Sequence, residues 1–281
     1  MDELIDLHVH TTASDGTMSP KQIVSYAKQK GLIAIGITDH DTISGIEEAQ
    51  KEGKLLGIEV IPGIEISTEF NGEMHLLGYY IKETFQLIKK LNGIRDKREI
   101  RNVKIISKLN ERGIDVSLEE VKEIAKGESI GRPHIAMVLM QKGYVDSVRT
   151  AFDKYLGKGK IAYVDREKVS PEEGIKIILE AGGLPVLAHP KYLNLSGAEL
   201  DILLVKLKEY GLVGIEAYYS MNTKNETGIY LRVAIKHGLA VTGGTDFHGN
   251  NKPEIDIGTG KGNMKLKYDI VNNLLKKFTL Y

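Results

Sequence analysis

The chain alternates short apolar segments with longer segments in which apolar residues recur every three or four positions. The short segments predict buried strands and lie near residues 5–10, 33–37, 58–67, 74–81, 184–189, 213–218 and 240–244. The longer segments predict amphipathic helices. Repeated strand and helix units with apolar strands favour an α/β parallel sheet or barrel, whose functional residues lie at the carboxyl ends of the strands.

Several predicted helices begin with a serine followed three positions later by Gln or Glu, the pattern of a capping box. These starts are Ser19 with Gln22, Ser44 with Glu47 and Ser170 with Glu173, and proline follows the first and third serines. Further helices are expected near residues 198–210 and 223–237 and after Tyr268. His237 precedes Gly238 at a helix end, where the dipole favours a cation, so we assign it a structural role.

Residues 85–165 keep the helical period without a convincing strand, and a capping box begins at Ser117. We interpret this region as a small helical insertion packed over one side of a barrel mouth. The barrel itself then comprises residues 1–84 and 166–281.

Composition narrows the function. The chain of 281 residues is 42% hydrophobic, enough for a substantial core. Its 38 basic and 38 acidic residues cancel, which argues against a surface built for long duplex DNA. There is no cysteine, so a bound metal must use His, Asp and Glu, which favours zinc, manganese or iron. The sequence lacks a secretory leader pattern and any apolar run of about 20 residues, so we expect a cytoplasmic protein without a membrane span.

His8 and His10 alternate along the first strand and therefore project to one side, which supplies half of a metal site. Asp15 follows in a Ser-Asp-Gly turn and can fold back as an oxygen ligand. The alternative is a histidine pair that is solvated or bonded to backbone.

Ligand-type side chains recur in or after the other predicted strands, namely His40, Glu65, His75, His189, Asp246 and His248. Their recurrence favours a shared metal centre over isolated histidines. Asp39 and Asp41 flank His40 and are candidates to orient it or to move a proton.

Clustered divalent ions lower the pKa of a bridging water and neutralise charge on a phosphoryl group. The chain has no Walker loop, no G-x-S-x-G elbow and no G-x-G-x-x-G fingerprint, which argues against kinase, serine hydrolase and dehydrogenase functions. The residues therefore predict a metal-dependent phosphoesterase that uses metal-activated water.

Within the insertion, Gly131-Arg132-Pro133-His134 begins a helix. Its backbone N–H groups, with Arg132 and His134, can hold a substrate phosphate. The alternative is an ordinary helix start with an exposed arginine.

Five ordered motifs carry a family resemblance: His8-Val9-His10 with Asp15, Thr38-Asp39-His40-Asp41, Pro62-Gly63-Ile64-Glu65, Ala188-His189-Pro190 and Thr245-Asp246-Phe247-His248. They resemble the motifs of the polymerase and histidinol phosphatase (PHP) superfamily. The resemblance implies a distorted (β/α)7 barrel with two or three divalent ions. It assigns one ion to His8, His10, Glu65 and Asp246, a second to Glu65, His75 and His189, and a third to Asp15, His40 and His248.

The insertion, with Gly131–His134 and Tyr155-Leu156-Gly157-Lys158-Gly159, resembles the branch that contains ribonuclease AM and 3′,5′-nucleotide bisphosphate phosphatases. This resemblance implies a nucleotide bisphosphate or a short 5′-phosphorylated RNA as substrate. Two alternatives stay open, a histidinol-phosphate-type phosphatase and a non-catalytic PHP module. The sequence leaves the physiological metal, the substrate length and the oligomeric state open.

Overall fold

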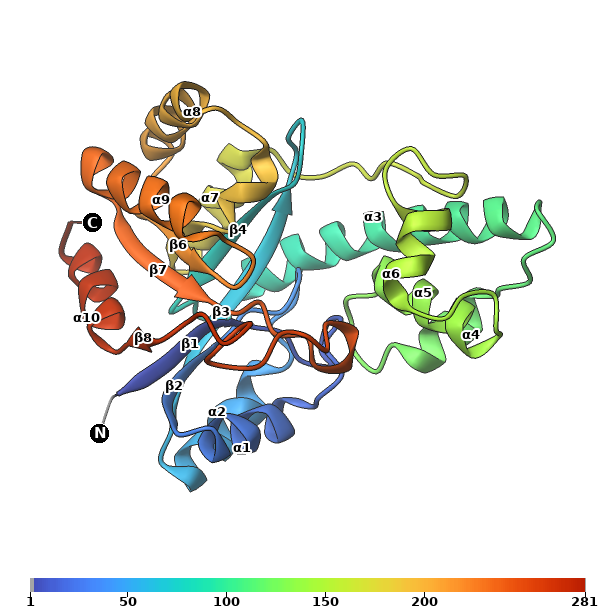
Figure 1. Ribbon diagram of the computed structural model, residues 1–281, viewed down its shortest axis with the longest axis horizontal. Helices are drawn as coiled ribbons and strands as arrows, with labels where there is room; N and C mark the ends of the chain where they lie inside the picture. The colour runs from blue at the N-terminus through green and yellow to red at the C-terminus, as the bar shows by residue number, and fades with distance from the viewer. Residues whose placement is uncertain (1–2, 281) are drawn as a thin grey trace.

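One sheet organises the computed structural model, which describes residues 3–280 (Figure 1). Its strand order is β7-β6-β5-β4-β3-β2-β1-β8. The strands are β1 (Leu4–Val9), β2 (Leu32–Ile37), β3 (Glu59–Thr68), β4 (Met74–Tyr79), β5 (Leu184–Leu187), β6 (Gly214–Tyr219), β7 (Ala240–Gly244) and β8 (Leu266–Lys267). Val9 pairs with Phe247 just beyond β7, so the sheet curls into a nearly closed barrel, as predicted.

The barrel departs from the parallel arrangement at β4, which runs antiparallel to both β3 and β5. Only residues 69–73 connect β3 to β4. A parallel connection needs about a dozen residues or more, whereas a connection this short permits a hairpin. The short β8 is also antiparallel to its neighbour β1.

Helices cover the outside of the barrel, with short turns between them. They are α1 (Pro20–Gln29), α2 (Ile46–Leu56), α7 (Pro171–Glu180), η2 (Pro190–Leu193), α8 (Gly197–Glu209), α9 (Lys224–His237), η3 (Gly249–Asn251), α10 (Asp269–Leu275) and η4 (Lys276–Leu280). Within residues 3–280, no helix is long and apolar enough to cross a bilayer.

The capping boxes predicted from sequence have different outcomes. Ser19 forms one with Gln22, as predicted. The box at Ser44 is wrong, because α2 begins one residue later with Gly45 as its N-cap. Ser170 does cap α7, but the carboxylate of Glu173 pairs with Lys90 at 2.8 Å.

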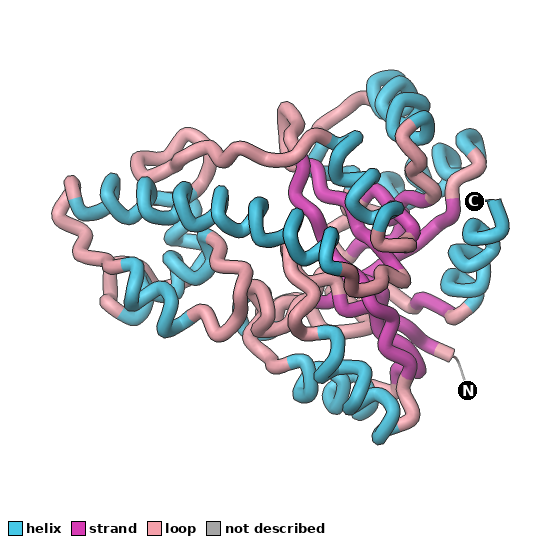
Figure 2. Tube along the Cα trace, turned by 180° about the vertical axis from the view of Figure 1, so that it is seen from behind, coloured by secondary structure: helices cyan, strands magenta, loops and turns pink. Residues whose placement is uncertain are grey.

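An arm of helices extends to one side of the barrel (Figures 1 and 2). It consists of α3 (Phe85–Asn110), α4 (Leu118–Ile124), α5 (Arg132–Gln141), α6 (Val148–Ala151) and a π turn, η1 (Phe152–Leu156). Leu91 of α3 packs in the barrel core, whereas Leu109 packs in a separate core formed by the arm. The 26-residue helix α3 therefore belongs to both parts.

The arm also touches the loop that follows β1. Ser129 donates its backbone N–H to the carbonyl of Ala13 at 3.3 Å. A side chain at Gly127 would collide with the carbonyls of Thr12 and Ala13, so only glycine permits this close approach. The contact brings the arm beside the loop that carries Asp15.

Candidate metal centre

The nine residues that the sequence singled out as metal ligands come together in one place. His8 and Glu65 lie within strands, and His10 immediately follows β1. The others are Asp15 after β1, His40 after β2, His75 in β4, His189 after β5, and Asp246 and His248 after β7. All except His40 are buried. Adjacent strands thus gather side chains that are far apart in sequence.

His8 and His10 form the first part of the cluster with two carboxylates. Their Nε2 atoms lie 3.1 Å apart. His10 Nε2 lies 3.2 Å from Glu65 Oε2 and 3.3 Å from Asp246 Oδ1. By mutual proximity His8, His10 and Asp246 form one group, and Glu65 lies beside it.

Glu65 links this part to the remaining histidines. Its Oε1 lies 2.8 Å from His75 Nδ1 and 2.9 Å from His189 Nε2. Its Oε2 lies 3.0 Å from His40 Nδ1. By mutual proximity, His189 groups with His8 and Glu65, whereas His75 groups with His40 and Glu65. The second predicted set is thus divided between two neighbouring groups.

Asp15 and His248 form the last part, with His248 Nε2 3.3 Å from Asp15 Oδ1. His40 Nε2 lies 3.9 Å from the other oxygen of Asp15. The ligand atoms of these three residues and of His10 all lie within 4.8 Å of one another. His10 therefore stands between the first and the last parts.

Several buried nitrogen and oxygen atoms of the cluster lack a hydrogen-bond partner among the described residues. His40 Nδ1 and Glu65 Oε2 are buried and only 3.0 Å apart, yet neither has a hydrogen-bond partner among the described residues. The same holds for His10 Nδ1 and His189 Nδ1. Imidazole and carboxylate atoms left unpaired in this way suit divalent cations, so the residues present fit a metal centre.

The charge states agree with a site that attracts cations. Burial lowers the pKa of His10, but Asp246 and Glu65 outweigh that effect and raise it to about 9. Burial would raise the pKa of Glu65, but His40, His75 and His8 together hold it well below its usual range. Ionised carboxylates thus attract protons to the histidines, and metal ions compete for the same positions.

Asp246 presents one oxygen to the histidines because the other is held elsewhere. Its Oδ2 lies 2.6 Å from Lys252 Nζ and accepts a hydrogen bond from the Tyr219 hydroxyl at 2.9 Å. Asp246 also has a φ of 58°, in the left-handed region. His189 has a φ of 22°, and strain of this kind is typical of functional sites.

Two buried carboxylates that sequence analysis missed support the cluster. Glu216, in β6, lies 2.8 Å from His8 Nδ1 and accepts the backbone N–H of His189 at 2.7 Å. Asp6 accepts the N–H groups of His8 and Thr245 at 3.2 and 2.9 Å. Each is a carboxylate within an otherwise apolar strand, the same signal that identified Glu65.

The two aspartates beside His40 bond to other groups. Asp39 accepts hydrogen bonds from Thr11 and Ser14 at 2.6 to 2.8 Å and so shapes the loop that bears Asp15. Asp41 is ion-paired with Arg98 and Arg166. Among the described residues, neither carboxylate forms a hydrogen bond or ion pair with the His40 ring, so their role in orienting His40 or moving a proton stays a prediction.

The predicted phosphate residues lie in the arm. Arg132 donates to the carbonyl of Leu156 at 3.1 Å, and its guanidinium lies over the ring of Phe152. His134 is buried, and its Nδ1 accepts the N–H of Gly131 at 3.0 Å, which caps α5. The backbone of Ser14 also hydrogen-bonds to the His134 ring. These contacts give His134 a structural role at the start of α5, and its role as a phosphate donor stays a prediction.

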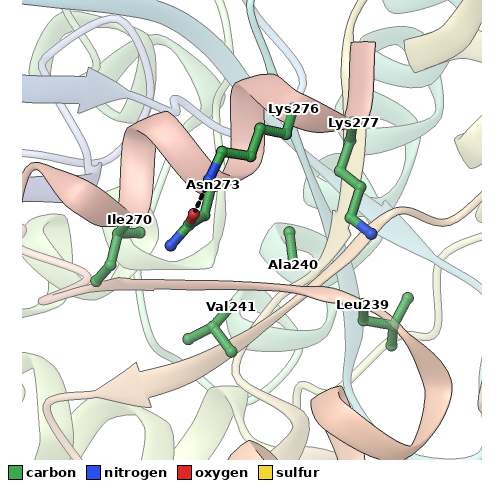
Figure 3. A pocket seen from close by; sticks show the side chains of 7 residues that line it. All are labelled: Leu239, Ala240, Val241, Ile270, Asn273, Lys276 and Lys277. Atoms are coloured by element: carbon green, nitrogen blue, oxygen red, sulfur yellow. Dashed lines mark hydrogen bonds between the residues drawn. The ribbon is translucent and has the colours of Figure 1, made fainter. Parts of the chain in front are cut away.

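A shallow pocket of about 400 Å³ lies away from this cluster (Figure 3). It is lined by Leu239, Ala240, Val241, Ile270, Asn273, Lys276 and Lys277. Ala240 begins β7, whereas Asp246 follows the other end of that strand. The pocket and the histidine cluster are therefore at opposite ends of β7.

Known proteins resemble this chain in sequence and in fold. The PHP domain model matches residues 6–167. A 5′-3′ exoribonuclease from Haemophilus influenzae is 38% identical over 250 residues, which cover 88% of this chain and 91% of the relative. A 3′,5′-nucleoside bisphosphate phosphatase from Chromobacterium violaceum is 30% identical over 257 residues, 90% of each chain. The crystal structure of a proposed metal-dependent phosphoesterase from Bifidobacterium adolescentis superposes with a TM-score of 0.87 at 29% identity, covering 97% of this chain and 96% of the other.

Proposed function

Because the chain belongs to the PHP family of metal-dependent phosphoesterases, we propose that it hydrolyses a phosphate ester of a nucleotide at the histidine cluster. The substrate is a nucleoside 3′,5′-bisphosphate or a short 5′-phosphorylated RNA, in keeping with the named activities of its relatives. A cytoplasmic location and an absence of duplex DNA binding remain expectations from the sequence.

One observation carries the proposal: six of the eight histidines converge with three carboxylates, and several of their atoms have no hydrogen-bond partner among the described residues. We assign the metal ligands as His8, His10, Asp15, His40, Glu65, His75, His189, Asp246 and His248. Their number suits two or three ions, with manganese, zinc or iron favoured by the nitrogen and oxygen donors. Divalent ions held there would activate water near neutral pH and neutralise phosphoryl charge.

The protein's own groups complete the site. Glu65 holds His75 and His189 with one oxygen and approaches His10 and His40 with the other, so it sets their spacing. Lys252 holds one oxygen of Asp246 and adds a cation at the edge of the cluster, where an anionic substrate is stabilised. This Lys252 side chain is 38% exposed, so substrate can reach it.

A non-catalytic module is the weaker alternative, because each of the nine positions that the family resemblance assigns to metal ligands carries a His, Asp or Glu. No described feature favours a histidinol-phosphate substrate. We therefore retain the nucleotide phosphoesterase as the proposed function.

Substitution of a proposed ligand tests this assignment. His10→Ala should lower bound manganese and reduce phosphate release from adenosine 3′,5′-bisphosphate by orders of magnitude, while the circular dichroism spectrum stays native. His237→Ala is the matched control, because His237 ends α9 and bonds to Asp201 of α8, outside the histidine cluster. Full metal content and activity in the His10 variant would show that the assignment is wrong.

A further inference from the structure

Glu73 places a carboxylate at the edge of the metal centre without belonging to the ligand cluster. It immediately precedes β4, which carries His75 two positions later. Its Oε1 lies 3.9 Å from His75 Nε2, which is too far for a hydrogen bond. The side chain is 53% exposed, so a substrate can reach its oxygens.

The turn that bears Glu73 is fixed against the segment that bears His189. The backbone N–H of Glu73 donates to the carbonyl of Tyr192 at 3.3 Å, and Tyr192 lies in η2, which begins directly after His189. A side chain at Gly72 would come within 3.2 Å of the Leu193 carbonyl, so the turn packs closely on η2. Glu73 therefore has a defined place beside the metal centre.

Positive side chains approach Glu73 from the side of the arm. Burial lowers the pKa of Arg132, and the negative charge of Glu73 opposes that effect. Burial also lowers the pKa of Lys168, in the segment before α7, and Glu73 again opposes it. Neither cation forms an ion pair with Glu73, whose only such neighbour among the described residues is His75. Glu73 thus lies between the metal ligands and the arm, and its oxygens are free to accept hydrogen bonds.

The chemistry of the proposed substrate limits what this carboxylate can bind. A carboxylate repels phosphate, and when ionised it only accepts hydrogen bonds, so it favours a nucleotide only through a donor group. In a nucleoside 3′,5′-bisphosphate the ribose lies between the two phosphates, and its only hydrogen-bond donor is the 2′-hydroxyl. With one phosphate at the metal ligands and the other at the predicted phosphate residue Arg132, the ribose comes to lie beside Glu73.

Building on the proposed function, we infer that Glu73 accepts a hydrogen bond from the 2′-hydroxyl of the substrate and so selects ribonucleotides over deoxyribonucleotides. Carboxylates bind ribose hydroxyls in this way in dinucleotide sites. The 2′-hydroxyl is also the group by which a protein distinguishes RNA from DNA. This choice of sugar is separate from the predicted recognition of the second phosphate by the arm.

Two substrates that differ only in the 2′-hydroxyl test the inference. Manganese-loaded wild type should hydrolyse adenosine 3′,5′-bisphosphate with a kcat/KM about 10- to 150-fold above that of the 2′-deoxy form, the range of a hydrogen bond to a charged group. Glu73→Ala should bring the two substrates close to parity. Glu83→Ala is the matched control, because Glu83 is exposed beyond the other end of β4, and it should keep the wild-type preference.

The inference is overturned if the wild type shows no preference, or if Glu73→Ala keeps the preference of the control. Bound manganese is measured on the same samples. Equal losses on both sugars, with less manganese bound, would mean that Glu73 acts through His75, and would also overturn the inference. Uridine 3′,5′-bisphosphate and its 2′-deoxy form should behave like the adenosine pair. A preference confined to adenine would assign Glu73 to the base and overturn its assignment to the sugar.

The same measurements separate this inference from the proposed function. If both adenosine substrates are hydrolysed with equal kcat/KM, the proposed function stands and the inference falls. If neither is hydrolysed, the proposed function fails, and calorimetry with manganese-loaded protein decides the inference. Adenosine 5′-monophosphate should then bind more tightly than 2′-deoxyadenosine 5′-monophosphate to the wild type and not to Glu73→Ala. Equal affinities in the wild type, or no binding of either nucleotide, would overturn the inference.

Discussion

Glu216 holds two of the histidine segments at once. One oxygen accepts from His8 Nδ1, which directs Nε2 of that ring toward His10. The other accepts the N–H of His189, whose backbone is strained. A carboxylate bonded to the outer nitrogen of a ligating histidine fixes its tautomer and raises its basicity.

We predict that Glu216→Gln weakens manganese binding about 10- to 100-fold, the usual cost of losing such a partner. The amide fills the same space but is neutral, so it lacks the negative charge that the carboxylate presents to His8 Nδ1. Competition with a chromophoric chelator measures the affinity, and Glu209→Gln on the exposed surface of α8 is the control. An affinity equal to that of the control would mean that Glu216 only fills space.

Asp41 acts at the junction of the barrel and the arm. Burial alone would raise its pKa, but Arg98, Arg166 and His40 lower it to about 2. A carboxyl group with a lowered pKa stabilises the fold fully above its ordinary pKa of 3.8, and this contribution is lost as pH falls toward 2.

Asp41→Asn should therefore cost about 2 kcal/mol of unfolding free energy near neutral pH, the equivalent of its pKa shift. Since wild type loses the same contribution on protonation, the difference should narrow below about pH 4. Urea unfolding across that range measures it, with Asp153→Asn, 72% exposed, as control. A difference that stays constant down to the acid limit would contradict the role of Asp41 as an ionised partner.

At the scale of elements, the strand-end rule found the cluster because it depends only on local pattern. His40, His189 and Asp246 each follow an apolar strand, and adjacent parallel strands bring such ends together. The direction of β4 could also have been predicted from the sequence, because the connection from β3 is too short for a parallel crossover.

Other features depend on contacts that a pattern does not contain. Arg98 and Arg101 look like ordinary polar positions of a long helix, yet both are buried. Glu216 carried the same signal as Glu65, but its partner His8 is 208 positions away. Gly45 replaces Ser44 as the cap of α2, and Thr42 bonds instead to the N–H of Ser44.

Damage in the core of the arm should reach Arg132 and His134, the predicted phosphate residues at the start of α5. Leu109→Ala truncates a fully buried side chain in the core of the arm. Such a change typically lowers the free energy of unfolding by about 2–5 kcal/mol. We predict faster amide exchange in α4 and α5 and a higher KM for adenosine 3′,5′-bisphosphate. Hydrolysis of p-nitrophenyl phosphate should be unaffected.

Val103→Ala on the same helix is the control, because Val103 is 48% exposed. The Val103→Ala substitution should change the free energy of unfolding by no more than about 0.5 kcal/mol. If Leu109→Ala slows the hydrolysis of both substrates equally, the arm does not act on substrate selection independently of the metal centre.

At the scale of the whole molecule, we assign the reaction to the barrel and the selection of substrate to the arm. The two parts meet at the loop after β1, where Ser129 bonds to Ala13, and at Asp41, where α3 is ion-paired to the barrel. Related chains could then keep the same reacting centre and change substrate through the arm.

The most direct test is to strip the protein with chelator and restore manganese stepwise while measuring phosphate release from adenosine 3′,5′-bisphosphate. The account predicts negligible activity in the stripped protein and a rise that follows the manganese bound per chain, measured by elemental analysis on the same samples. Full activity in protein shown to hold no metal would contradict it.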